Sequence, residues 1–124
     1  MVINTANKEI LRTHFANGRK HDFKMFKESK FYVNNTANIL ADTGYQGIFK
    51  LNCNAIIPFK KKRNTLLTEE QKDFNHKLSS KRICVENVFA VLKRFKIISC
   101  KYRNRRKRFG LRFNLIAGFY NWEL

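Results

Sequence analysis

The stretch "SSKRICVENVFAVLKRFK", which begins at Ser79, most constrains the fold, because its apolar residues recur at helical spacing. Just upstream, Thr68 and Gln71 have the Ser/Thr-x-x-Glu/Gln spacing of a capping box, a reciprocal pair of side-chain bonds at a helix start. We therefore expect one long helix from Thr68 to about Arg94. A break near Ser79–Ser80 is the alternative that the sequence leaves open.

The two faces of this expected helix differ in character. At about 100° per residue, its apolar side chains gather on one side, namely Cys84, Val85, Val88, Val91 and Leu92. The opposite stripe carries Ser79, Arg82, Glu86 and Lys93, and only Phe89 interrupts it. One face is thus suited to a core and the other to polar chemistry.

The rest of the chain predicts short strands and two further helices. Residues 2–15 predict a β-hairpin, and the segments 38–41 and 54–59 predict short buried strands. Asp22 is expected to cap a helix over residues 21–32, and residues 109–124 form the pattern of an amphipathic helix. We expect residues 96–104 to be extended or irregular. The mixture predicts an α/β fold, in a single domain over residues 1–124 because no repeat or linker interrupts it.

Charge and composition narrow the class of partner. The chain of 124 residues has 26 Lys and Arg against 9 Asp and Glu, a net charge of +17. Its apolar fraction of 44%, with twelve Phe, excludes a disordered basic tail. A folded domain this basic favours a nucleic acid as partner. No apolar run approaches a membrane span and no leader is visible, so we expect a cytoplasmic, nucleoid-associated protein whose Cys53, Cys84 and Cys100 are reduced thiols.

Two basic clusters are candidates for contact with DNA phosphates. Ordinary solvated charge is the alternative. The candidate residues are Lys60, Lys61, Lys62, Arg63, Arg103, Arg105, Arg106, Lys107 and Arg108.

One carboxylate, Glu86, stands among twelve Lys and Arg between Lys81 and Arg112. The simplest interpretation is an Arg82–Glu86 pair on the helix surface. A second carboxylate, Asp42, follows an apolar segment and precedes a glycine turn, where ligands bind in open α/β sheets. Alternatively, its side chain only satisfies turn N–H groups. Two carboxylates in a basic domain also suit Mg²⁺, which prefers carboxylate oxygens and bridges phosphates.

Three segments, "ADTGYQG", "VENVFAVLKRFK" and "YRNRRKRFGLRFNLIAGFYNWEL", resemble the C-terminal part of a DDE-superfamily transposase. The similar group comprises bacterial insertion-sequence enzymes related to Harbinger transposases, and the similarity covers nearly the whole chain. In that family an Asp-x-Gly-Tyr motif holds the second catalytic aspartate. It falls on Asp42, Gly44 and Tyr45.

The catalytic glutamate of the family lies in a Tyr-x2-Arg-x3-Glu-x6-Lys signature. Arg82, Glu86 and Lys93 match its last three members, whereas Ser79 stands at the Tyr position. The resemblance implies that Asp42 and Glu86 are catalytic metal ligands for Mg²⁺ or Mn²⁺. It also implies that Arg82 and Lys93 steady DNA phosphates or the carboxylate.

The resemblance further implies an RNase H-like fold and a third carboxylate on a strand before the hairpin. That strand is missing here, so the fold would be partial and Met1 an internal start, as in a truncated copy or a split reading frame. Asp22 is the reserve candidate for a further site residue. Expected partners are transposon-end and target DNA, another copy, the upstream half, or an intact transposase. Two rival functions remain open: a non-catalytic nucleic-acid-binding module, and a regulatory fragment that pairs with an intact enzyme.

Overall fold

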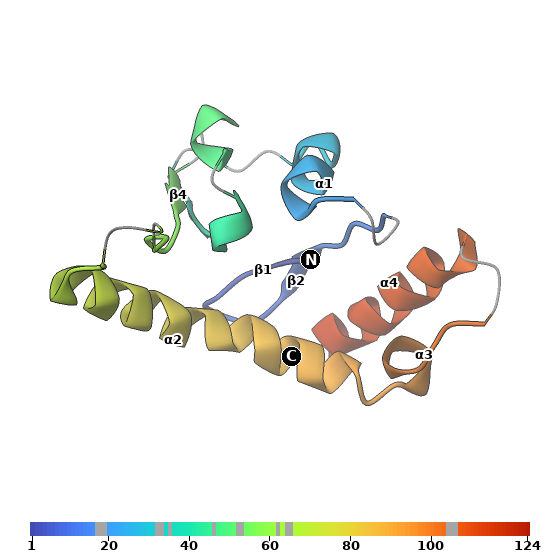
Figure 1. Cartoon of the computed structure of the whole chain (residues 1–124). Coiled ribbons are helices and arrows are strands. Elements are labelled where there is room, and N and C mark those ends of the chain that lie inside the picture. Colours follow the sequence, from blue (N-terminus) through green and yellow to red (C-terminus); the bar gives the residue numbers. More distant parts are fainter. Residues whose placement is uncertain are drawn as a thin grey trace. The chain divides into compact units, whose positions relative to one another are not determined.

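The computed structural model of the chain describes residues 1–16, 20–31, 34, 36–45, 47–51, 54–61, 63, 66–103 and 107–124 (Figure 1). The elements in chain order are β1 (Val2–Ile3), β2 (Ile10–Arg12), α1 (Asp22–Glu28), β3 (Asn38–Leu40), η1 (Thr43–Tyr45), η2 (Ile48–Leu51), β4 (Asn54–Ile56), α2 (Glu69–Leu92), α3 (Lys96–Ser99) and α4 (Lys107–Trp122). They form two compact units, Met1–Phe15 with Ile83–Leu124, and Ala16–Arg82. Helices and strands are mixed, as the α/β prediction requires.

The long helix α2 confirms the prediction made from its capping box. The Thr68 backbone N–H donates to Gln71 Oε1 at 3.2 Å, and the Gln71 N–H donates to Thr68 Oγ1 at 3.3 Å. The helix runs unbroken through Ser79–Ser80, so the alternative of a break there is wrong. The Ser80 hydroxyl donates to the His76 carbonyl, one turn earlier in the helix, at 3.1 Å.

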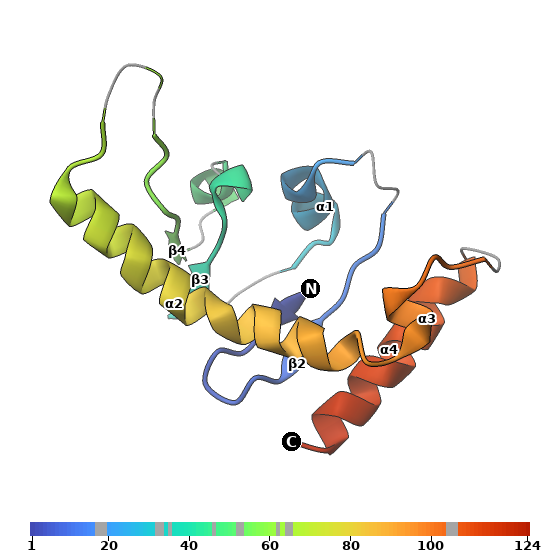
Figure 2. The same ribbon diagram turned by 60° about the horizontal axis from the view of Figure 1, so that its bottom comes forward.

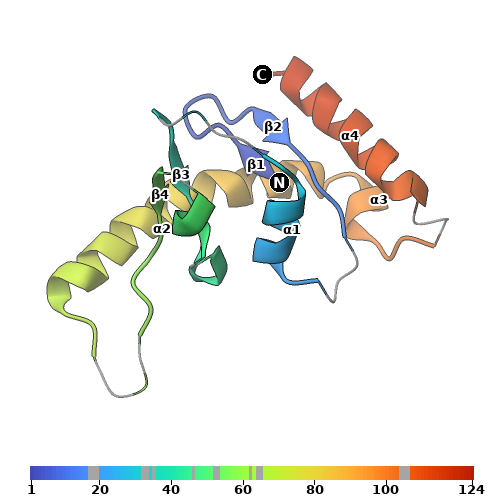
Figure 3. The same ribbon diagram turned by 90° about the horizontal axis from the view of Figure 1, so that it is seen from above.

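The first unit builds its core between a hairpin and the C-terminal helices. Strands β1 and β2 are antiparallel, with Ile3 opposite Ile10, as the sequence predicts. Figure 3 shows β2 beside α4, which also confirms the expected C-terminal helix. The core consists of Ile10, Val88, Leu92, Phe113 and Ala117. Val88 with Leu92 and Phe113 with Ala117 are both four residues apart, so each helix presents one face to this core.

Asn121 fastens helix α4 to the hairpin. Its Oδ1 accepts the Ile10 N–H at 2.8 Å, and its Nδ2 donates to the Ile10 carbonyl at 2.9 Å. One side chain thus pairs both backbone groups of Ile10, the first residue of β2. An uncovered strand edge would be a template for association, so this contact also protects the hairpin.

Replacing Asn121 by Ala should lower the free energy of unfolding by about 1–3 kcal/mol, because both part-buried Ile10 backbone groups lose their partners. Asn114→Ala is the control, since Asn114 makes one exposed bond to the Thr13 hydroxyl. Urea unfolding followed by circular dichroism measures both. Equal losses for the two variants would contradict a special role for Asn121.

The second unit contains a parallel pair of strands. Strand β3 pairs with β4 from Asn38 opposite Asn54 to Leu40 opposite Ile56, which confirms both predicted strands (Figure 2). Ala41, Ile48 and Leu78 are buried in this unit. Gly47 lies against the Phe23 ring, where an added Cβ would come within 2.5 Å of Cε1. The turn after β3 therefore packs closely on α1.

Two local predictions are wrong. The N-cap of α1 is His21, whose Nδ1 accepts the Phe23 N–H at 3.3 Å. Asp22 is instead the first helical residue, where its charge still suits the helix dipole. Within residues 96–104, Lys96–Ser99 forms the short helix α3, whose Ile98 packs on the first unit's core, while residues 100–103 are irregular as predicted. Cys53 lies outside the described residues.

Candidate active site

Asp42 lies two residues beyond the end of β3, at the start of the η1 turn. Its carbonyl accepts the Tyr45 N–H at 2.9 Å, and its side-chain Oδ1 accepts the Thr43 N–H at 2.6 Å. The predicted strand-end position is confirmed, and the side chain also accepts a turn N–H group. The turn fixes the carboxylate without using all of its oxygen lone pairs.

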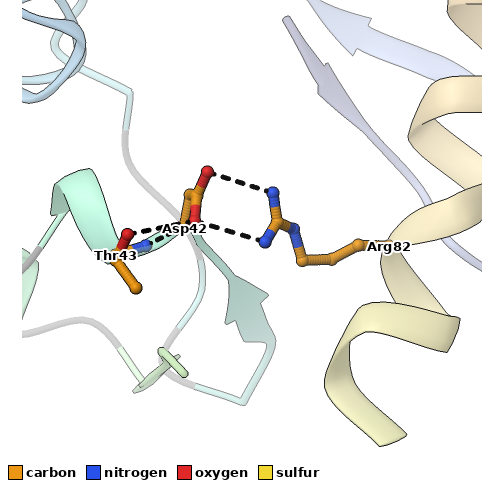
Figure 4. A network of polar contacts seen from close by, with 3 residues as sticks. All are labelled: Asp42, Thr43 and Arg82. Atoms are coloured by element: carbon orange, nitrogen blue, oxygen red, sulfur yellow. Dashed lines mark hydrogen bonds and ion pairs between the residues drawn. The ribbon is translucent and has the colours of Figure 1, made fainter. Parts of the chain in front are cut away.

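Arg82 of helix α2 holds the same carboxylate from the other side (Figure 4). Nη1 donates to Oδ1 at 3.3 Å and Nη2 lies 3.2 Å from Oδ2. The Asp42 and Arg82 side chains are 54% and 33% exposed, so the pair adds only about 0–1 kcal/mol to stability. Positioning is its more important effect. Arg82 therefore pairs with Asp42 rather than with Glu86, contrary to the simplest interpretation of the helix surface.

These contacts set the charge state of the turn. The Thr43 N–H has the largest effect on the pKa of Asp42 and lowers it, burial opposes this, and the charge and hydrogen bond of the Arg82 guanidinium lower the pKa further. Burial raises the pKa of Tyr45, and the negative charges of Asp22 and Asp42 raise it further. At neutral pH the site thus presents an ionised carboxylate beside a neutral phenol.

The lowered pKa of Asp42 predicts a pH effect on stability. The folded pKa lies below the unfolded value of about 3.9. The ionised Asp42 side chain therefore stabilises the fold above that pH, and this stabilisation is lost as pH falls through the folded pKa. We expect Asp42→Asn to cost up to about 1 kcal/mol near pH 6, because the pair is largely exposed. Toward pH 3 the cost should shrink. Urea midpoints measure this, with Asp73→Asn as the control for removing one carboxylate; a constant difference would contradict it.

Glu86 lies on α2 as the sequence predicts, whereas Lys93 is the first residue after the end of this helix. Glu86 is exposed on α2, one turn after Arg82, and the Lys93 N–H donates to the Phe89 carbonyl at 2.9 Å. Ser79 is exposed one turn before Arg82. Asp42 belongs to the second unit and Glu86 to the first, and their joint role as metal ligands stays a prediction.

The metal-binding prediction rests on these carboxylates. Asp42 fits a divalent ion, since it offers exposed, ionised oxygen. Over the part of the chain that the structure describes, three or more His, Cys, Asp or Glu side chains nowhere gather into a cluster able to hold a metal ion.

The basic candidates are exposed wherever their side chains are described: Lys60, Lys61, Arg63, Arg103 and Arg108. Lys62, Arg105 and Arg106 lie outside the described residues, as does the side chain of Lys107.

Sequence reasoning missed one feature beside the first basic cluster. Asn75 Oδ1 accepts the Phe59 N–H at 2.8 Å, and Asn75 Nδ2 donates to the Phe59 carbonyl at 3.0 Å. The Phe59 and Phe74 rings meet edge to face, with their centroids 5.3 Å apart. Phe59 and Phe74 are 48% and 40% exposed. The signal in the sequence was the aromatic residue directly before the lysines.

The DDE superfamily endonuclease family matches residues 1–121 of this chain. The chain belongs to this family. It is also 45% identical, over all 124 residues, to the probable transposase for insertion sequence element IS702 of Microchaete diplosiphon. The chain spans 45% of that relative's length.

Comparison with solved structures gave no match. Within the described residues, the helices are too short or too polar to cross a membrane.

Proposed function

We propose that the chain is the C-terminal part of the catalytic domain of a DDE transposase, which cleaves and transfers DNA strands during insertion-sequence transposition. One observation carries the proposal most strongly. Arg82, one helical turn and about 6 Å along the axis from Glu86, grips Asp42 with both terminal nitrogens. The residues that match two separate family motifs are thereby linked through one side chain. Family membership over residues 1–121 supports the same conclusion.

In this proposal Asp42 and Glu86 are shared ligands of Mg²⁺ or Mn²⁺. A bound divalent ion would supply activation of the attacking water or 3′-OH and stabilisation of the leaving oxygen. Asp42 is held ionised by the Thr43 N–H and Arg82, so it needs no deprotonation before it binds a cation. Arg82 keeps the carboxylate aimed, and the exposed Lys93 contacts a DNA phosphate.

The finer fold that we propose is a partial RNase H-like fold in one catalytic domain. The antiparallel hairpin of the first unit and the parallel β3–β4 pair of the second unit supply the strands of this proposed fold. Because Asn121 already occupies both backbone groups of Ile10 in β2, we place a further strand at β1 in this proposal. A strand carrying the third carboxylate would suit that edge.

The partners that we propose are transposon-end DNA, target DNA, and the upstream half or an intact transposase. The exposed lysines and arginines support contact with phosphates. Such an enzyme would act on the bacterial nucleoid in the cytoplasm.

Strand cleavage tests this function. We expect the 124-residue chain alone to leave element-end DNA intact in Mg²⁺ or Mn²⁺, because three carboxylates place the metal pair in this family and the matched positions supply two. Joined to the upstream half of a transposase such as the IS702 relative, it should nick that DNA.

Glu86→Gln in the extended protein is the control, and it should abolish nicking while leaving DNA binding intact. Nicking by the chain alone that Glu86→Gln removes would show that the third ligand is misplaced, with Asp22 as the first suspect. Nicking that survives Glu86→Gln would overturn the proposed role of this residue.

A further inference from the structure

Helix α4 carries an apolar seam on its exposed side. Leu111, Leu115, Gly118 and Trp122 recur at intervals of four, three and four residues, the spacing of a coiled-coil seam. Leu111, Leu115 and Trp122 are 64%, 56% and 85% exposed. Phe119 lies beside the seam and is 63% exposed. The face with Phe113 and Ala117 already packs on the core, so the seam is surplus to folding of the first unit.

Gly118 sits in the middle of this seam. Apart from the adjacent residues and the backbone of α4 itself, no atom of the described residues lies within 4 Å of where its Cβ would be. A glycine inside a helix costs roughly 0.5–1 kcal/mol relative to alanine, and no neighbour in the described chain makes use of the space it leaves. The space fits a side chain that approaches from outside.

The charges of α4 oppose its own dipole. Arg108 lies in the first turn and Arg112 in the next, whereas the acidic Glu123 follows the last turn. Positive charge at a helix N-terminus and negative charge at its C-terminus are both unfavourable. A second helix running antiparallel would reverse this relation, because each basic end would meet an acidic end.

The same residues lie on one flank of the seam. Counting about 100° per residue, Arg108, Arg112 and Glu123 all fall to the side on which Phe119 lies. In an antiparallel pair of helices related by a two-fold axis, each flank of the seam in one copy lies beside the same flank in the other copy. Arg108 and Arg112 of one copy would therefore lie near Glu123 of the other.

We propose that the seam is the contact between two copies of this chain, paired through antiparallel α4 helices about a two-fold axis. The two helices are aligned so that Leu115 of one copy covers Gly118 of the other. In this alignment Leu111 packs on Trp122 of the other copy. Complete burial of the exposed parts of the seam residues and of Phe119 would remove at most about 500 Å² per copy from water, or about 1,000 Å² in the pair. That area reaches the lower bound for a specific protein interface, and it fits a reversible dimer.

Sedimentation of the full chain tests the dimer. At about 0.3 M salt, which screens the repulsion between two highly positive copies, we expect a concentration-dependent monomer–dimer equilibrium. Leu115→Glu should weaken association at least tenfold. Leu66→Glu changes a leucine of the second unit that is even more exposed, at 79%, and it should leave association unchanged. Circular dichroism verifies that both variants fold.

A charge exchange tests the antiparallel register. Arg108→Glu should weaken the dimer although it lowers the net charge, and Glu123→Arg should weaken it too. The double variant, which has the original net charge, should restore association. Three results would overturn the proposal. The chain could stay monomeric at all concentrations, Leu115→Glu and Leu66→Glu could weaken the dimer equally, or the double variant could associate more weakly than both single variants.

Discussion

Raising the salt concentration from 50 to 200 mM should weaken binding of this chain to duplex DNA by about 10³–10⁵-fold. The reason is the release of counterions from the six to ten phosphates that a surface this basic would neutralise, which gives a log–log slope of roughly −5 to −9. Fluorescence anisotropy with unrelated duplexes of one length measures the slope. Affinities that differ little between duplexes of different sequence would show that phosphate contacts provide most of the binding.

A pair of matched variants locates the contact. Lys60→Ala/Lys61→Ala removes two exposed charges of the loop before α2, and Lys24→Ala/Lys50→Ala removes two exposed charges elsewhere in the second unit. Each phosphate contact contributes about 0.9 to the slope, so the first variant should reduce its magnitude by about 2 and the second by less. A slope near zero in the unmodified chain would contradict phosphate contact altogether. Equal effects of the two variants would contradict a specific role for the loop.

Removing either candidate metal ligand should strongly lower the affinity of the chain for a divalent ion. We expect Asp42→Asn and Glu86→Gln each to lower the affinity for Mn²⁺ at least tenfold, because a hard divalent ion depends on anionic oxygen ligands. Calorimetric titration measures the change. Asp73→Asn, which removes an exposed carboxylate on the same helix as Glu86, is the control and should leave the affinity unaltered.

Local patterns predicted the elements that local interactions determine. The Thr68–Gln71 capping box and the apolar face of α2 are both contained within a few turns of helix, and both are confirmed. Strands β3 and β4 were visible because short apolar runs were bounded by turn residues. The position of Asp42 just after β3 followed from the same reasoning.

The contacts that escaped prediction join residues far apart in the sequence. Arg82 reaches Asp42 across 40 positions, so the nearer Glu86 seemed its natural partner on a helix surface. Asn121 reaches Ile10 across 111 positions, and no pattern marks an amide that pairs with a strand edge. The predicted cap of α1 is off by one residue, because the His21 side chain accepts the Phe23 N–H and so serves as the cap in place of Asp22.

Mn²⁺ broadening of amide signals in the NMR spectrum of the chain tests the shared site of Asp42 and Glu86 most directly. A paramagnetic ion held by both carboxylates should broaden residues 41–45 and 83–89 together at low occupancy. Asp42→Asn or Glu86→Gln should then remove the broadening from both segments at once. Broadening of one segment alone, or broadening centred on Glu69, Glu70 and Asp73, would contradict the account.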